Sequence, residues 1–140
     1  MKTFLDTNVW ISAFATKGLA RELVTLVLDL NASGELTLLI SDAVQQETAR
    51  VLREKFGLDP AAIDTALDVQ AMAATCVPAT AGLLPTDIPD PDDAPILAAA
   101  LAAGADLFVT GDKALLALGA VESMPIVEPR AAYLKLRGLA

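Results

Sequence analysis

The chain has 140 residues, of which 54% are apolar, and its 18 acidic and 10 basic residues give a net charge of −8. A chain of this length and composition can bury one sizeable core, so we predict a single domain over residues 1–140 and exclude general disorder. The absence of histidine excludes Ser-His-Asp and Cys-His catalysis and the common zinc sites, which leaves carboxylates as the leading catalytic candidates.

Short apolar runs alternate along the chain with longer segments of helical pattern. In chain order they predict strand 2–5, helix 18–31, strand 36–40, helix 42–55, helix 60–74, strand 75–78, loop 79–93, helix 95–103, strand 107–110, strand 125–127 and helix 131–137. This alternation predicts an α/β fold with a mostly parallel sheet of about five strands, covered by helices on both faces. A ligand site is then expected beyond the carboxyl ends of the strands, where the strand order reverses.

Cellular location and thiol chemistry follow from local composition. The N-terminal sequence MKTFLD lacks the apolar run of a secretory signal. Uncharged stretches near the middle of the chain, such as Ala94–Ala105, are shorter than the roughly 20 residues of a membrane-spanning helix. We therefore expect a cytoplasmic protein. Its single cysteine, Cys76, has apolar neighbours and predicts a buried thiol.

Two aspartates directly follow predicted strands. Asp6 comes after the first strand, beside Thr7 and Asn8, and Asp112 ends the sequence VTGD, whose glycine permits a tight turn. Both carboxylates should therefore stand at the same edge of the sheet. The alternative for each, taken singly, is an ordinary turn or helix-cap aspartate.

Glu47 lies within the helix predicted after the second strand. With Val44 and Val51 it forms an i, i+3, i+7 set that we expect to face the core. A carboxylate on an apolar stripe costs free energy unless it is paired or binds a cation. A salt bridge to a nearby arginine, or a position at the edge of the stripe, is the alternative.

Three aspartates, Asp90, Asp92 and Asp93, precede the alanine-rich helix 95–103. One of them would suffice to cap the helix and to complement its dipole. The remaining negative charge favours a metal site or a solvated loop. Asp93 is nearest the start of the helix and is our preferred site residue.

Four of these carboxylates, from Asp6, Glu47, Asp93 and Asp112, can converge at one rim of the sheet. Clustered carboxylates shift each other's pKa values unless hard cations neutralise them, and Mg²⁺ prefers such oxygen ligands. Two ions about 4 Å apart could activate a water and stabilise the leaving oxygen of a phosphodiester.

The net charge bears on the substrate in two ways. An acidic chain argues against nucleic acid, because positive charge supplies most of the affinity for phosphates. Divalent cations bound by the acids would make the local electrostatic potential positive and so permit RNA binding. Alternatively, the excess negative charge could bind a basic partner protein. Both alternatives remain open from the residues alone.

Several motifs resemble the PIN-domain family, especially the toxin ribonucleases of VapBC-type toxin–antitoxin pairs. The matching pieces are FLDTNVWISA, SDAVQQETARVL, DPDDAPILAAALAAGADLFVTGD and IVEP. They occur in the family's order and span nearly the whole chain. The third piece, which joins Asp93 to Thr110 and Asp112 at this spacing, is the most specific.

The resemblance implies a three-layer α/β/α fold and metal-assisted hydrolysis of RNA by a toxin. It implies that Mg²⁺ or Mn²⁺ is bound by four catalytic carboxylates, those of Asp6, Glu47, Asp93 and Asp112. Asn8 and Thr110 would support them, and Asp90 or Asp92 could share the role of Asp93.

The resemblance also implies partners. Family members in toxin–antitoxin pairs are commonly homodimers held inactive by a small antitoxin, which often covers the acidic site with basic residues. An acidic chain fits such a partner. On the substrate side, the basic residues expected near the rim are candidates for phosphate binding: Lys17, Arg21, Arg50, Arg53 and Lys113.

Two other functions remain open. A metal-dependent phosphatase could use Asp6 as a nucleophile, although it would want a lysine after a later strand, for which Lys113 is the convenient candidate. A non-catalytic interaction module could use the acidic rim to bind a basic protein. Four converging acids argue against that module, since a scaffold has no need of them.

Overall fold

A six-stranded sheet organises the structure, a computed structural model that describes residues 1–78 and 88–138. The strands are β1 (Lys2–Leu5), β2 (Thr37–Ser41), β3 (Thr75–Val77), β4 (Leu107–Val109), β5 (Ala120–Val121) and β6 (Met124–Val127). Their order is β3-β2-β1-β4-β6-β5, and every neighbouring pair is parallel except β5 with β6. The predicted α/β class with a mostly parallel sheet is confirmed. The sequence pattern does not predict β5, because two residues are too short to show a period.

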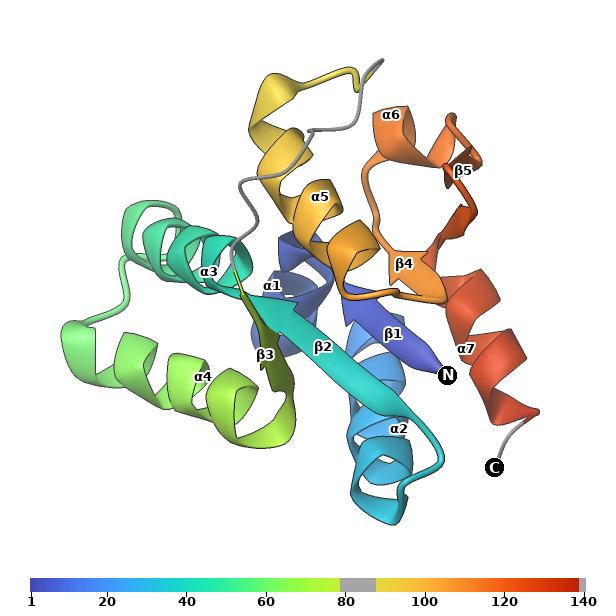
Figure 1. Cartoon of the computed structure of the whole chain (residues 1–140). Helices are drawn as coiled ribbons and strands as arrows, with labels where there is room; N and C mark the ends of the chain where they lie inside the picture. The colour runs from blue at the N-terminus through green and yellow to red at the C-terminus, as the bar shows by residue number, and fades with distance from the viewer. Residues whose placement is uncertain (79–87, 139–140) are drawn as a thin grey trace.

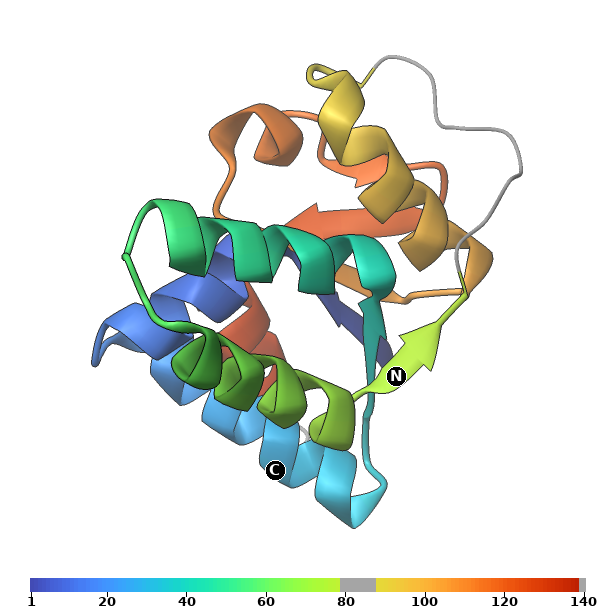
Figure 2. The same ribbon diagram turned by 90° about the vertical axis from the view of Figure 1, so that its left-hand side faces the viewer.

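Helices cover both faces of this sheet. They are α1 (Thr7–Ala15), α2 (Leu19–Ser33), α3 (Asp42–Glu54), α4 (Pro60–Ala73), the 3₁₀ turn η1 (Pro91–Asp93), α5 (Ala94–Ala102), α6 (Lys113–Leu116) and α7 (Pro129–Arg137). Helix α5 lies on one face, α1, α2 and α7 lie on the other, and α3 and α4 flank the β2–β3 edge (Figures 1 and 2). Within the described residues, no helix is long and apolar enough to cross a membrane.

Local capping sets most helix boundaries. The Ser41 hydroxyl accepts a hydrogen bond from the Val44 amide at 3.3 Å, and the Asp59 carboxylate accepts one from the Ala62 amide at 2.8 Å. Helix α2 ends at Gly34, whose φ of 83° lies in the left-handed region that favours glycine. The starts of α3 and α4 agree with the predicted helices 42–55 and 60–74, whereas α2 continues two residues beyond the predicted end at residue 31.

Three local expectations need correction or restriction. Helix α1 follows Asp6 at once, whereas the sequence pattern predicts no helix there. The predicted buried thiol is wrong: Cys76 is exposed, because β3 lies at the end of the strand order and pairs with β2 alone. Part of the predicted loop 79–93, residues 79–87, lies outside the described residues, and Pro91–Asp93 form η1.

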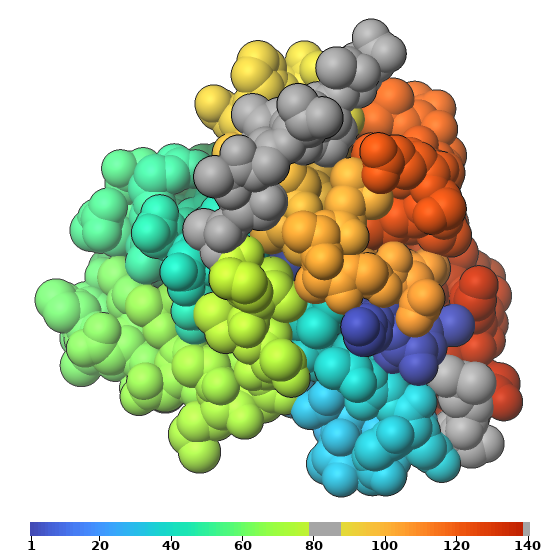
Figure 3. Space-filling model, viewed as in Figure 1, coloured from blue at the N-terminus to red at the C-terminus, as the bar shows by residue number. Residues whose placement is uncertain are grey.

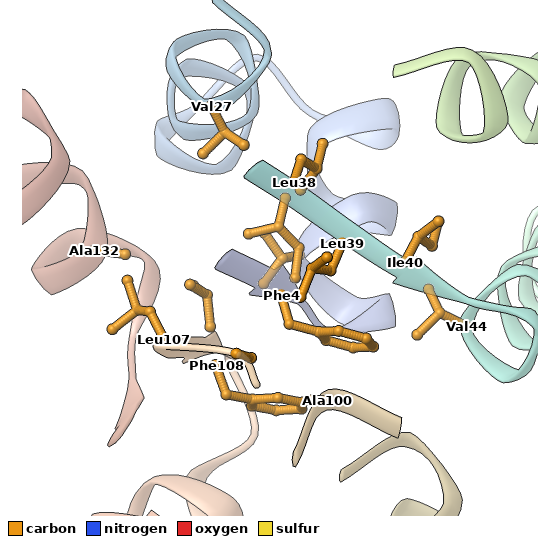
Figure 4. Packing of buried hydrophobic residues seen from close by; sticks show 14 of the residues in the cluster. Phe4, Val27, Leu38, Leu39, Ile40, Val44, Ala100, Leu107, Phe108 and Ala132 are labelled. Atoms are coloured by element: carbon orange, nitrogen blue, oxygen red, sulfur yellow. The ribbon is translucent and has the colours of Figure 1, made fainter. Parts of the chain in front are cut away.

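The core is divided between the two faces of the sheet. Parallel pairing sets Phe4 beside Phe108, and their rings stack with centroids 5.4 Å apart under Ala100 of α5 (Figure 4). Leu107 points to the opposite face, toward Ala132 of α7. In the space-filling view, the start of the chain is visible as a dark-blue patch beside the orange atoms of the segment that leads to β4 (Figure 3). The parallel pairing of β1 with β2 and with β4 sets the register of the carboxyl ends of the central strands.

The Phe4–Phe108 stack yields a stability prediction. Phe108→Ala should lower the free energy of unfolding by about 3–5 kcal/mol, because it leaves a cavity in a fully buried site. Urea unfolding monitored by circular dichroism would measure the change. Met72→Ala, at a side chain that is 88% exposed on α4, should change it by less than about 0.5 kcal/mol. A similar loss in both variants would contradict this account of the core.

Candidate active site

The reversal of strand order lies between β1 and β4. From β1 the chain adds β2 and β3 on one side, and β4 and β6 on the other. The Asp6 amide donates to the Val109 carbonyl at 2.9 Å, and the Thr110 amide donates to the Val127 carbonyl at 3.0 Å. Asp6 and Thr110 therefore stand side by side at the carboxyl ends of the two central strands, where ligand sites of such sheets form.

A buried carboxylate occupies this position. Asp6 is only 5% exposed, and its Oδ1 accepts a hydrogen bond from the Thr7 amide at 2.8 Å. Its Oδ2 accepts one from the Thr110 hydroxyl at 2.8 Å and one from the Asn8 side-chain amide at 3.2 Å. The side chains of Asn8 and Thr110 thus contact Asp6 directly, and they fix the orientation of its carboxylate.

Asn8 also joins α1 to the segment after β4. Its Nδ2 donates to the Thr110 hydroxyl at 3.0 Å, and its Oδ1 accepts from the Gly111 amide at 2.8 Å. A Cβ on Gly111 would lie 3.3 Å from Asn8 Oδ1, a distance that requires the asparagine to shift. The backbone of Gly111 is outside the left-handed region, so this glycine serves the close approach of Asn8 more than a tight turn.

Asp112 combines a structural and a site position. Its Oδ1 caps α6 by accepting from the amides of Ala114 at 2.8 Å and Leu115 at 3.3 Å. Its own amide donates to the Thr110 hydroxyl at 3.0 Å. The helix-cap alternative is therefore true of Asp112 and also of Asp6, and it does not exclude a role in a site.

Glu47 is half-buried at the edge of the inward stripe of α3. The buried residues of this helix are Val44, Thr48 and Leu52. The predicted core-facing stripe of Val44, Glu47 and Val51 is therefore wrong by one position at its last two residues. Thr48 takes the core position because its hydroxyl donates to the Val44 carbonyl at 2.7 Å. Within the described residues, the side chain of Glu47 has no ion pair.

The nearest arginine on α3 pairs elsewhere. Arg50 binds Glu54 at 3.1 Å, so the salt-bridge alternative for Glu47 is not observed. The Glu47 carboxylate is therefore not neutralised by its own helix, and it stays available to a cation or to substrate.

The three aspartates before α5 have different roles. Asp90 Oδ1 accepts a hydrogen bond from the Asp92 amide at 2.9 Å and so caps η1. Asp93 occupies the cap position of α5, but its side chain makes no capping hydrogen bond. Asp90 and Asp92 are exposed and Asp93 is half-buried. The preferred candidate thus carries the carboxylate that helix capping leaves free.

Electrostatic coupling joins the four predicted carboxylates. Burial raises the pKa of Asp6 from 3.8 to about 6, although hydrogen bonds from Thr110 and Thr7 oppose the shift, and the charges of Glu47 and Asp112 add to it. Burial likewise raises the pKa of Asp93 to about 6, with contributions from the charges of Asp6, Asp90, Asp112 and Glu47. The structure therefore brings Asp6, Glu47, Asp93 and Asp112 within mutual influence, and Asp90 belongs to the same field.

The donor set is compatible with a hard divalent cation, though not with a closed cage. In residues 1–78 and 88–138, no three Asp, Glu or Cys side chains form a ready metal-binding cluster. Mg²⁺ commonly keeps several waters and uses only one or two carboxylates directly. Asp6 and Asp93 bear raised pKa values, so a nearby cation would relieve the repulsion that their ionisation creates.

Two surface pockets flank the carboxylates. One, of about 370 Å³, is lined by residues that include Asn8, Ser12, Gly111 and Asp112. The other, of about 280 Å³, lies between α3 and the start of α5 and includes Glu47. Sequence reasoning missed Ser12, although its position one helical turn after Asn8 would have indicated it once α1 was recognised.

The basic residues predicted to bind phosphate lie in different environments. Arg21 donates to the carbonyls of Ala13 at 3.0 Å and Phe14 at 3.3 Å, so it serves the end of α1. Lys17, Arg53 and Lys113 are exposed and line neither pocket beside the carboxylates. Arg50 lines the same pocket as Glu47.

Comparison with known proteins identifies the family. The family model described as PIN domain matches residues 2–114. The chain belongs to the PIN-domain family. No curated protein gives a significant sequence match.

Two solved structures share this PIN-like fold. The VapBC2 structure from Rickettsia felis, bound to a DNA fragment from its promoter, aligns with a TM-score of 0.68 at 18% identity, over 91% of this chain and 98% of the other. PAE2754 from Pyrobaculum aerophilum aligns with a TM-score of 0.67 at 15% identity, over 99% of both chains. At these identities the likeness establishes the fold.

The raised pKa of Asp6 gives a pH prediction. An acid with a higher pKa in the folded than in the unfolded state binds protons more tightly when folded, so stability falls as pH rises from about 4 to about 6. Asp6→Asn should remove this contribution, which is at most about 3 kcal/mol for a shift of about two pKa units. Urea unfolding at pH 4 and pH 7 without divalent ions would measure it.

The informative quantity is the difference between the two pH values in each variant. Asp64→Asn, at an exposed position on α4, should keep the wild-type difference. An unchanged difference in Asp6→Asn would show that Asp6 ionises normally in the folded protein.

Proposed function

We propose that the chain is a Mg²⁺- or Mn²⁺-dependent endoribonuclease and the toxin component of a toxin–antitoxin pair. The observation that carries the proposal is the coupling of Glu47, Asp93 and Asp112 to the buried, immobilised carboxylate of Asp6. Membership of the PIN-domain family supports it, since the resemblance of this chain is to the toxin ribonucleases of that family.

In the proposed mechanism the four carboxylates have two different roles. Asp6 and Asp112 are held by backbone amides, so they would fix the position of the ion. The side chains of Glu47 and Asp93 make no hydrogen bond to the described residues, so their oxygens would be free to turn toward the ion or toward the attacking water. A bound ion would supply charge stabilisation and would lower the pKa of an attacking water, in a chain that has no histidine to act as a general base.

A phosphatase with a nucleophilic Asp6 is a weaker candidate. Both oxygens of this carboxylate accept hydrogen bonds, and the residue is almost fully buried. A nucleophile needs an accessible oxygen that can attack phosphorus in line. The environment of Asp6 is better suited to holding a ligand in place.

RNA cleavage tests the proposal. Purified protein should cleave a mixed RNA pool that includes tRNA when Mn²⁺ or Mg²⁺ is present, and excess chelator should stop it. Asp6→Asn should lower the rate roughly 10²-fold or more, because the variant loses the charge at the centre of the site. Asp64→Asn, an exposed carboxylate on another helix, should cleave like the wild type.

Metal binding by the same proteins distinguishes the remaining alternatives. An ion at ten times its Kd should stabilise the folded wild type by about 1.4 kcal/mol, and Asp6→Asn should lose most of this effect. Cleavage that Asp6→Asn leaves intact would contradict the site. Neither cleavage nor stabilisation by metal would favour the interaction module, in which the acidic rim binds a basic protein.

The proposed partners can be tested by co-expression. We expect a small antitoxin with basic residues, because the net charge of −8 favours a basic partner, and a homodimer because the family resemblance implies one. The similarity to the fold of the VapBC2 structure supports this proposal. Co-expression with the neighbouring open reading frame should yield a complex with little ribonuclease activity. Recovery of the free, active nuclease under these conditions would contradict it.

A further inference from the structure

The pocket beside Glu47 is lined by polar and charged side chains and by apolar ones. Ala43, Gln46 and Arg50 contribute from α3, and Pro95 and Ile96 contribute from the start of α5. Glu47 belongs both to this pocket and to the group of coupled carboxylates. A ligand in the pocket would therefore be in reach of the proposed cleavage site.

The pocket suits one nucleotide. Its volume of about 280 Å³ is just below the range of drug-sized ligand sites, roughly 300 to 1,000 Å³, and so limits the ligand to a small group. Ala43 and Pro95, which lie over the buried Ile96, offer apolar contacts to the face of a planar base, and the Gln46 amide offers both a donor and an acceptor for its edge.

Arg50 supplies the positive charge of this pocket. It follows Glu47 by three residues on α3, which places the two side chains on neighbouring positions of one helix face. Its guanidinium pairs with Glu54, but that pair is about half exposed on both sides and is worth little in water. A phosphate could replace Glu54 and form a stronger, bidentate contact.

The distribution of charge fixes the orientation of such a ligand. Asp92 and Glu47 also line the pocket and would repel a phosphate, so the phosphate must lie against Arg50 while the uncharged base faces the rest. The pocket on the Asp112 side has no cation among its lining residues in the described part of the chain. The two flanks of the carboxylates are therefore chemically different.

We propose that the pocket between α3 and α5 is a nucleotide subsite, in which Arg50 binds the phosphate next to the scissile one and Gln46 contacts the base. This inference rests on the proposed ribonuclease function, and it makes Arg50 and Gln46 residues that bind and select substrate.

Salt-dependent RNA binding tests the role of Arg50. A fluorescent ten-nucleotide single-stranded RNA is titrated with Asp6→Asn protein, to prevent cleavage, over a series of NaCl concentrations. Adding Arg50→Ala should weaken binding about tenfold and reduce the slope of log K against log salt by about 0.7, the contribution of one phosphate contact on a single strand. Adding Arg50→Lys should keep the slope, because the charge remains.

Matched variants on the same helix separate binding from helix stability. Arg53→Ala removes an exposed positive charge outside the pocket and should change the affinity less than twofold. Glu54→Gln breaks the pair with Arg50 and should leave RNA affinity equal or higher. Equal losses in Arg50→Ala and Arg53→Ala would overturn the subsite, because they would indicate a non-specific field.

The outcome also separates this inference from the proposed function. If the wild type cleaves RNA while Arg50→Ala leaves affinity and slope unchanged, the subsite is wrong and the ribonuclease stands. If the wild type neither binds nor cleaves RNA, both are wrong. Sequencing of the cleavage ends tests Gln46 separately. Gln46→Ala should relax the base preference of the wild type at the position beside the cut. An unchanged base preference would show that Gln46 does not contact the base.

Discussion

Burial of the Asp6 carboxylate at the carboxyl end of β1 is costly, and the surrounding structure is arranged to limit that cost. The groups that bind it come from α1 and from the segment after β4, and the same Thr110 hydroxyl accepts the amide of Asp112. These hydrogen bonds therefore hold α1 and α6 in place relative to β1. They do not fully replace the lost hydration, since the pKa of Asp6 stays raised at about 6. The missing contribution is positive charge, which a divalent cation would supply in the proposed function.

Helix geometry adds to this arrangement. Asp6, Asp93 and Asp112 occupy the cap positions of α1, α5 and α6, so three helices begin at the rim where the carboxylates gather. The N-terminal ends of helices carry partial positive charge, which offsets some of the repulsion between the acids. Capping and site formation are thus served by the same residues. This explains why the helix-cap interpretation of a single aspartate could not be separated from the functional one by sequence alone.

The sequence predicts the sheet well because its strands are short, continuous apolar runs, and Asp6 and Asp112 are found at the sheet edge because each follows such a run. Features that depend on distant contacts are predicted poorly. Thr48 takes a core position by bonding to the Val44 carbonyl, which moves Glu47 to the edge of the stripe. Cys76 is exposed because β3 is an edge strand, and strand order is not encoded in local pattern. Likewise, helical spacing allows Arg50 to pair with either Glu47 or Glu54, and the sequence alone does not decide that Glu54 is the partner.

The net charge of −8 constrains how such a protein could select RNA. Non-specific binding to nucleic acid depends on many phosphate contacts, and this chain has few positive charges near the rim. Arg21 is occupied by the end of α1, which leaves Arg50 as the arginine that lines a pocket shared with the carboxylates. Affinity would then depend on bound divalent ions and on a small number of specific contacts. An RNA that does not place a nucleotide in the Arg50 pocket would be held weakly, so the acidic surface itself would restrict the range of substrates.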